Sequence, residues 1–286
     1  MDTYLSELMQ HLSERTPLQV DVGNINKQNF PWINAVAGYE RMLGSLGVHC
    51  DVAMRDRIIE NYIYRDLIFL RMAQFSGRPF SLHEVANSEE QSFARQETLY
   101  LGSHDFFQVI TPLLLARAGT AVFPFVDSPL NMVDPVVAAL ARAVYENGQQ
   151  YLSGGRCIKV DQDNRESWRS HFEAALQAGS AIYAAIDQFP AFMRVHDNSV
   201  VSGKYGQYRL VSGAISQSMA AGYKCVYVKV VQMGGRYCIR TKGLTGDTVD
   251  AICSQYVAEV ERDFDTYPDG WEGILRLLPS VPVSSV

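Results

Sequence analysis

Short apolar segments alternate with helix-length amphipathic segments from about residue 90 onward, and this alternation constrains the fold most. The segments with strand character are Thr98–Leu101, Ala121–Val126, Cys157–Val160, Ala181–Ile186, Tyr223–Val231 and Arg236–Lys242. The segments with helical character end with Leu115, Val144, Ala178, Ala221 and Asp263. Strands that alternate with helices form sheets with helices on their faces. We therefore expect an α/β protein with a central mixed sheet flanked by helices.

The first part of the chain has a different character. Apolar residues at helical spacing predict helices over Met1–Leu12, Trp32–Leu46 and Met54–Phe75, with a loop over Pro17–Pro31. No linker is long enough to indicate independent domains. We expect a single domain over residues 1–286, with an N-terminal helical layer over 1–85 and an α/β core over 86–286.

Charge and cysteine content limit the partners. The net charge is −6, which does not favour a nucleic-acid backbone as partner. The five cysteines lack a CxxC spacing, which favours reduced thiols and a cytoplasmic protein. No apolar run reaches the length of a transmembrane helix. The amphipathic first helix leaves peripheral contact with a membrane open, although its polar face is not basic.

Common catalytic motifs do not occur. A GxSxG elbow, a Walker A sequence, GxGxxG and HExxH are all missing from the sequence, which predicts neither a nucleotide cofactor nor a metal. Cys50 follows His49 directly, but ordinary packing explains this neighbourhood better than nucleophilic catalysis.

One segment combines a strand, a turn of small residues and a helix start: Tyr100-Leu101-Gly102-Ser103-His104-Asp105. It resembles the HxxxxD block of the glycerolipid and lipid A acyltransferases. Further segments resemble that family in the same order along residues 54–274. They are the helix Met54–Phe75, the strand Ala121–Val126 with the stretch 129–134 after it, the strand ending in Asp187-Gln188, the pairs Tyr205-Gly206 and Ser212-Gly213, and Tyr267–Trp271.

The resemblance implies a glycerolipid acyltransferase-like fold and a particular chemistry. In that family the histidine is a general base for an acceptor hydroxyl, which attacks a thioester of acyl carrier protein or coenzyme A. The acidic residue five positions later orients the imidazole. The thioester is the co-substrate, and no other cofactor is implied.

This chain departs from the family at the base position, because Tyr100 stands where the histidine is expected and Asp105 aligns with the acid. A phenol has a pKa near 10 and is a poor base at neutral pH. Three interpretations are open. His104 has taken over as base, transferase chemistry has been lost, or His104 caps a helix while Tyr100 packs. The candidate catalytic residues are therefore His104, Asp105 and Tyr100.

Four residues are candidates for substrate binding. Asp187 and Gln188 are expected at a strand end facing the same cleft, with a structural role as the alternative. The resemblance suggests that Arg194 contacts a carboxylate or phosphate, although a solvated loop also explains it. It further implies an apolar acyl tunnel beside the helix that Ser212 begins.

The function expected is transfer of an acyl or aminoacyl group from a carrier-protein or coenzyme A thioester to a soluble or carrier-tethered nucleophile, in specialised metabolism. An acyl or peptidyl carrier protein and a small-molecule acceptor are the expected partners. Two rivals remain: a non-catalytic acyl- or carrier-binding protein without the base, and a thioesterase-type hydrolase in which His104 and Asp105 activate water.

Overall fold

The computed structural model describes residues 2–13, 15–74, 95–116, 120–127, 135–160, 165–187, 198–233 and 236–271. Its centre is a six-stranded sheet with the order β3-β2-β4-β1-β7-β8. The strands are β1 (Thr98–Gly102), β2 (Val122–Asp127), β3 (Ile158–Val160), β4 (Ala181–Ala185), β7 (Lys224–Met233) and β8 (Arg236–Leu244). All neighbouring strands pair in parallel except β7 and β8. The expected α/β class with a mixed sheet is confirmed, and the expected strands lie within about two residues of the observed ones.

β1 lies between β4 and β7, and its register decides which side chains meet. Leu101 pairs with Ala184 on β4 and with Tyr227 on β7. Because side chains alternate along a strand, odd-numbered and even-numbered residues of β1 face opposite sides of the sheet. Leu99 and Leu101 accordingly belong to one apolar cluster, and Tyr100 belongs to another.

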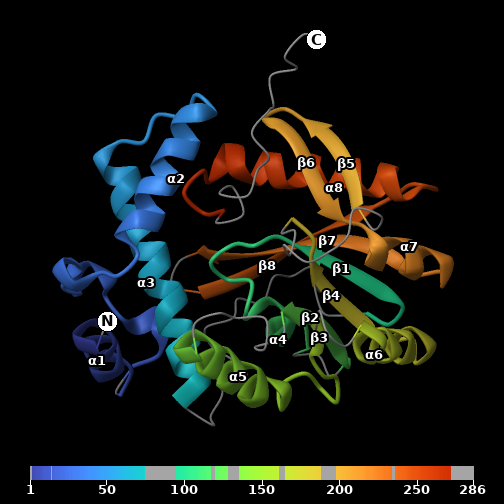
Figure 1. The fold of residues 1–286 in the computed structure, drawn as a ribbon, viewed down its shortest axis with the longest axis horizontal. Helices are drawn as coiled ribbons and strands as arrows, with labels where there is room; N and C mark the ends of the chain where they lie inside the picture. The colour runs from blue at the N-terminus through green and yellow to red at the C-terminus, as the bar shows by residue number, and fades with distance from the viewer. Residues whose placement is uncertain are drawn as a thin grey trace.

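Helices cover both faces of the sheet (Figure 1). Those of the α/β part are α4 (Thr111–Leu115), α5 (Pro135–Gln149), α6 (Arg165–Gln177), α7 (Gly213–Ala220) and α8 (Val249–Thr266). Side chains of α6, α7 and α8 pack on the Leu101 face, and side chains of α4 and α5 pack on the Tyr100 face.

The helix expected to begin at His104 or Asp105 begins later. A turn occupies residues 106–110, and α4 starts at Thr111 with Pro112 near its first position. Proline fits the first turn of a helix, where its missing N–H has no intrahelical partner. The expectation of a start at His104 or Asp105 was therefore wrong, whereas the alternative expectation from the sequence, that Pro112 marks a late helix start, is confirmed.

Three longer helices and short 3₁₀ turns form the N-terminal part, on the left of Figure 1. The helices are α1 (Asp2–Leu12), α2 (Ile33–Ser45) and α3 (Val52–Gln74), and the 3₁₀ turns are η1 (Pro17–Gln19), η2 (Val22–Asn24) and η3 (Lys27–Asn29). Asp66 of α3 ties this layer together by accepting hydrogen bonds from the Tyr4 hydroxyl at 2.9 Å and the Trp32 indole at 2.6 Å. The apolar cluster that contains Leu99 and Leu101 extends from α1 to this face of the sheet.

A hairpin that the sequence did not indicate lies against α8. It consists of β5 (Asn198–Gly203) and β6 (Gly206–Val211), which pair antiparallel. Glu261 of α8 accepts hydrogen bonds from the Tyr205 backbone N–H at 3.1 Å and the Tyr208 hydroxyl at 2.8 Å. A Cβ at Gly203 would collide with Glu261, so this close approach requires glycine.

None of the described helices combines the length and apolarity needed to cross a bilayer. All five cysteines are free thiols.

Candidate active site

A histidine and an aspartate meet where two neighbouring parallel strands end. His104 follows β1, and Asp187 follows β4. The carboxyl ends of parallel strands lie at the same edge of a sheet, which is where ligands bind in open α/β sheets. His104 Nδ1 lies 2.7 Å from Asp187 Oδ1, and the histidine side chain is 15% exposed whereas that of Asp187 is 2% exposed. The imidazole therefore contacts a buried carboxylate and still reaches the surface.

Asp187 is held by several donors. The His104 backbone N–H donates to both carboxylate oxygens, at 3.0 and 2.9 Å. The indole Nε1–H of Trp271 donates to Oδ2 at 2.8 Å. Burial acts to raise the pKa of Asp187, but the charge and hydrogen bonds of His104 and the hydrogen bond of Trp271 outweigh it, so this pKa lies below its usual value. Asp187 is thus an anion in the fold.

The ionised carboxylate determines the tautomer of His104. A carboxylate only accepts hydrogen bonds, so Nδ1 of a neutral His104 carries the proton that Asp187 accepts. Nε2 then has the lone pair. This is the arrangement in which an imidazole removes a proton from a nucleophile.

Asp105 has a different role from the one that the resemblance implied. Its Oδ1 accepts the Phe107 backbone N–H at 2.8 Å, which closes the turn after β1. Burial raises the pKa of Asp105 to about 7, although the Lys229 ammonium and the Phe107 N–H lower it. The residue that orients the His104 imidazole is Asp187, not Asp105. Two residues adjacent in sequence rarely point their side chains at each other, whereas strand pairing brings residues 104 and 187 together.

A buried charged cluster lies behind Asp105, on the β7 and α8 side. Asp263 of α8 is 1% exposed and accepts hydrogen bonds from the Tyr227 hydroxyl at 2.8 Å and from Arg240 Nη2 at 2.7 Å. Lys229 Nζ lies 3.9 Å from Asp263 Oδ2, with 6% of the side chain exposed. Buried Lys229 and the more exposed Arg240 thus place positive charge against the buried carboxylates, which keeps the charge of this region near balance.

Tyr100 does not meet the His104–Asp187 pair. It lies on the other face of the sheet, and its hydroxyl accepts the Arg95 backbone N–H at 3.0 Å. Arg95 precedes β1, so this hydroxyl points toward the amino end of the strand. Burial raises the pKa of Tyr100, with Arg95 acting in the opposite direction. The geometry therefore places His104, rather than Tyr100, at the strand end where a base is expected.

The remaining candidates are distributed unevenly. Ser212 is buried directly before α7, and its neighbour Val211 donates a backbone hydrogen bond of 3.1 Å to Ile186, the residue before Asp187. The backbone that precedes Ser212 thus lies beside the backbone that leads to Asp187. Gln188 and Arg194 lie outside the described residues.

Two residues of the site had no role in the sequence interpretation. Trp271 belongs to the segment Tyr267–Trp271, which was noted only for its resemblance. Lys229 is the one charge inside the otherwise apolar stretch 225–231, and a lone lysine in a central strand is a usable signal for a buried ion pair.

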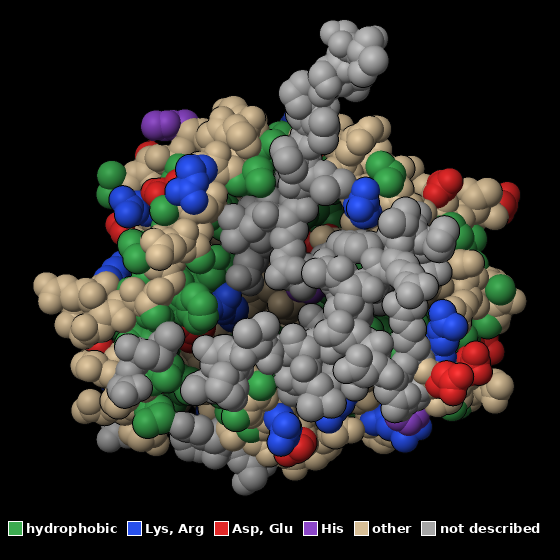
Figure 2. Space-filling model, in the orientation of Figure 1, with side chains coloured by type: hydrophobic (Ala, Val, Ile, Leu, Met, Phe, Trp, Pro, Cys, Tyr) green, Lys and Arg blue, Asp and Glu red, His purple; other side chains and the backbone are tan. Residues whose placement is uncertain are grey.

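The molecular surface is hollowed near the centre of the face shown in Figure 2, with histidine colouring inside the hollow. Within the described ranges, no group of three or more His, Cys, Asp and Glu side chains could hold a metal ion.

A scan against protein-family models finds no match, and no curated protein matches the sequence. The geometry of the site is therefore the basis for proposing a function.

Proposed function

We propose that this protein is an acyltransferase with a glycerolipid acyltransferase-like fold, which uses His104 as its general base. The acyl or aminoacyl donor is a carrier-protein or coenzyme A thioester, and the acceptor is a soluble or carrier-tethered nucleophile. The observation that supports the proposal most is the 2.7 Å contact between His104 Nδ1 and the buried Asp187, with the imidazole partly exposed.

The chemistry follows from that geometry. The acceptor X–H places its proton on Nε2 of His104 as X attacks the thioester carbonyl carbon. Asp187 stabilises the imidazolium that forms. When the tetrahedral intermediate collapses, the C–S bond breaks and the thiolate takes the proton from the imidazolium. The products are acyl-X and a free thiol, and no covalent acyl-enzyme is required.

The test is turnover of carrier-protein and coenzyme A thioesters, with and without amines and alcohols, followed by mass spectrometry. His104→Ala is expected to reduce acceptor-dependent turnover by about 100-fold or more, because a positioned general base contributes about that much. His171→Ala is the matched control, since His171 is on α6 and makes none of the contacts of Asp187 described above. Its rate is expected to remain unchanged.

Tyr100→Phe separates the two candidate bases. Because the Tyr100 hydroxyl contacts the Arg95 backbone, this variant is expected to retain turnover. A loss of activity in Tyr100→Phe with full activity in His104→Ala would overturn the assignment of the base. Thioester loss that is independent of any acceptor would indicate the thioesterase alternative, in which water is the nucleophile. Binding without turnover would indicate the non-catalytic alternative.

A further inference from the structure

The segment after α8 reaches the buried oxygen of Asp187 that the imidazole does not contact. Trp271 Nε1 donates to Asp187 Oδ2 at 2.8 Å, while His104 Nδ1 contacts Oδ1. The carboxylate is therefore held at both oxygens, by one side chain from the β1 turn and one from the C-terminal part of the chain. With one oxygen fixed by Trp271, the other has a defined direction toward the imidazole.

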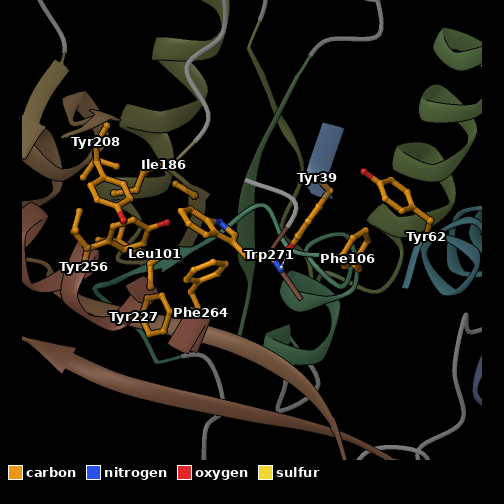
Figure 3. Packing of buried hydrophobic residues seen from close by; sticks show 14 of the residues in the cluster. Tyr39, Tyr62, Leu101, Phe106, Ile186, Tyr208, Tyr227, Tyr256, Phe264 and Trp271 are labelled. Carbon is orange, nitrogen blue, oxygen red and sulfur yellow. Dashed lines mark hydrogen bonds between the residues drawn. The ribbon is translucent and has the colours of Figure 1, made fainter. Parts of the chain in front are cut away.

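The indole itself is fixed by packing. Trp271 is 2% exposed. Its ring stacks on Tyr208 of β6 at a centroid distance of 6.3 Å and meets Phe264 of α8 edge-on at 5.9 Å. Figure 3 shows Trp271 among these rings, with Tyr39 on its other side. Because side chains from several elements pack against the indole, its orientation is fixed, and its N–H points in one direction.

The N-terminal layer fixes the backbone of the same segment. The Tyr39 hydroxyl of α2 donates to the Pro268 carbonyl at 2.8 Å and accepts the Trp271 backbone N–H at 3.0 Å. Asn61 of α3 donates to the Asp269 carbonyl at 2.8 Å, and Arg57 pairs with the Asp269 carboxylate at 3.0 Å. Helices α2 and α3 thus hold the turn that presents the indole.

We infer that Trp271 is a positioning residue of the His104–Asp187 pair, and that Tyr39 supports it from the N-terminal layer. Trp271 directs the carboxylate and takes part of its negative charge through the hydrogen bond. The expected effect of Trp271 on the rate of turnover rests on the proposed function. The expected effect of Trp271 on the protonation of the His104 imidazole does not.

The direction of the effect follows from charge. Without the indole donor, Asp187 keeps more negative charge for the imidazole, which favours the imidazolium. Trp271→Phe is therefore expected to raise the pKa of His104. The other ionisable groups around the pair are unchanged by this substitution. They are Asp105 on the turn after β1, Lys229 on β7, Asp263 on α8, and the tyrosines Tyr183, Tyr227 and Tyr256.

The experiment is an NMR titration of isotope-labelled histidine in the full chain, with His104→Ala used to assign the signal. Trp271→Phe is expected to raise the pKa of His104 and to lower kcat about tenfold, the order of effect of one hydrogen bond to a charged group. The rise of kcat with pH should move to higher pH by the same amount as the pKa of His104.

Trp32→Phe is the matched control. It removes an indole hydrogen bond to another buried aspartate, Asp66, in the N-terminal layer. It is expected to lower stability and to leave the His104 titration and kcat unchanged. Tyr39→Phe, which keeps the indole, is expected to shift the pKa of His104 in the same direction as Trp271→Phe, by a smaller amount.

The outcomes separate the two proposals. An unchanged His104 titration in folded Trp271→Phe would overturn the positioning role, whatever the activity. A shifted titration with an unchanged rate profile would support the positioning role and contradict the use of His104 as general base. If Trp271→Phe does not fold, Tyr39→Phe decides, and an unshifted His104 in that variant would also overturn the inference.

Discussion

The pKa values of two buried aspartates are shifted in opposite directions. Both residues lie three residues or fewer beyond the ends of neighbouring strands. Asp105 is buried with its pKa raised to about 7, and Asp187 is buried with its pKa lowered by His104 and Trp271 despite its burial. The difference lies in the donors. The side chain of Asp105 accepts one backbone N–H, whereas Asp187 accepts the His104 ring, the His104 backbone and the Trp271 indole. The number and charge of the donors decide the ionisation of these two acids.

This contrast predicts a pH-dependent stability. The folded pKa of Asp105, about 7, is above its unfolded value, so the folded chain holds an extra proton between about pH 4 and about pH 7. The contribution of Asp105 to stability is therefore greatest at low pH and falls as pH rises through that window, by at most about 1.4 kcal/mol per pH unit. The free energy of unfolding of Asp105→Asn, relative to that of the wild type, should therefore rise as the pH increases from about 5 to about 7 in urea unfolding experiments.

Asp187→Asn is the matched comparison, because the contribution of Asp187 to stability changes with pH in the opposite direction. A depressed carboxyl pKa gives stability that is present above the unfolded pKa and lost only as pH falls below about 4. The variant should therefore be less stable than the wild type by about 3 kcal/mol, because it leaves the donors of His104 and Trp271 without their buried carboxylate partner. The prediction for Asp105 would be contradicted if the wild type became more stable than Asp105→Asn as the pH rises. That result would show that the fold favours the charged form of Asp105.

At the level of elements, the end of β1 is constrained by its neighbours. Tyr256 of α8 donates to the Gly102 carbonyl at 2.8 Å, and Tyr183 of β4 fills the space where a Cβ at Gly102 would be. The strand that leads to His104 is therefore packed against both an adjacent strand and a helix. A substitution at Gly102 is therefore expected to displace the imidazole of His104.

Gly102→Ala is expected to destabilise the fold by about 1–3 kcal/mol, because the added methyl collides with the Tyr183 ring. Gly44→Ala is the control, since Gly44 lies in the last turn of helix α2 with open space around it. There the same substitution should not destabilise the fold and should stabilise it by at most about 1 kcal/mol. Both stability changes would be measured from the midpoint of urea unfolding. Equal effects of the two substitutions would contradict the collision at Gly102.

The strands and most helices could be predicted from the sequence, because apolar runs and helical spacing report burial directly. The hairpin β5–β6 was missed, since Asn198–Gly203 has few apolar residues and packs on α8 through Glu261. His104 and Asp187 were both candidates, but their pairing was not foreseen. It depends on β4 lying beside β1, which is a property of strand order. The contacts of Trp271 depend on a segment more than 80 residues beyond Asp187, as the 84-residue separation of their hydrogen bond shows.

At the scale of the whole molecule, one apolar cluster joins the N-terminal layer, the sheet and the helices on its Leu101 face. Trp32 from the N-terminal layer, Trp168 from α6 and Trp271 from the C-terminal part all pack in it. These are the three tryptophans of the chain. We therefore expect the helical layer and the α/β core to unfold together.

Variants with a single tryptophan, the other two replaced by phenylalanine, test this cooperativity. In each variant, the fluorescence of the remaining tryptophan should change at the same denaturant concentration as the far-UV circular dichroism. A separate, earlier transition at Trp32 would show that the N-terminal layer unfolds independently. That result would contradict a single domain over residues 1–286.

The position of β1 between β4 and β7 has a consequence for synthesis on the ribosome. A nascent chain that has reached β4 has formed one neighbour of β1, but the other edge of β1 remains open until β7 is made. Open strand edges pair readily with other chains. Folding of the central sheet is thus expected to finish only after β7 has left the ribosome, and chaperone capacity during that interval should influence the yield of the protein.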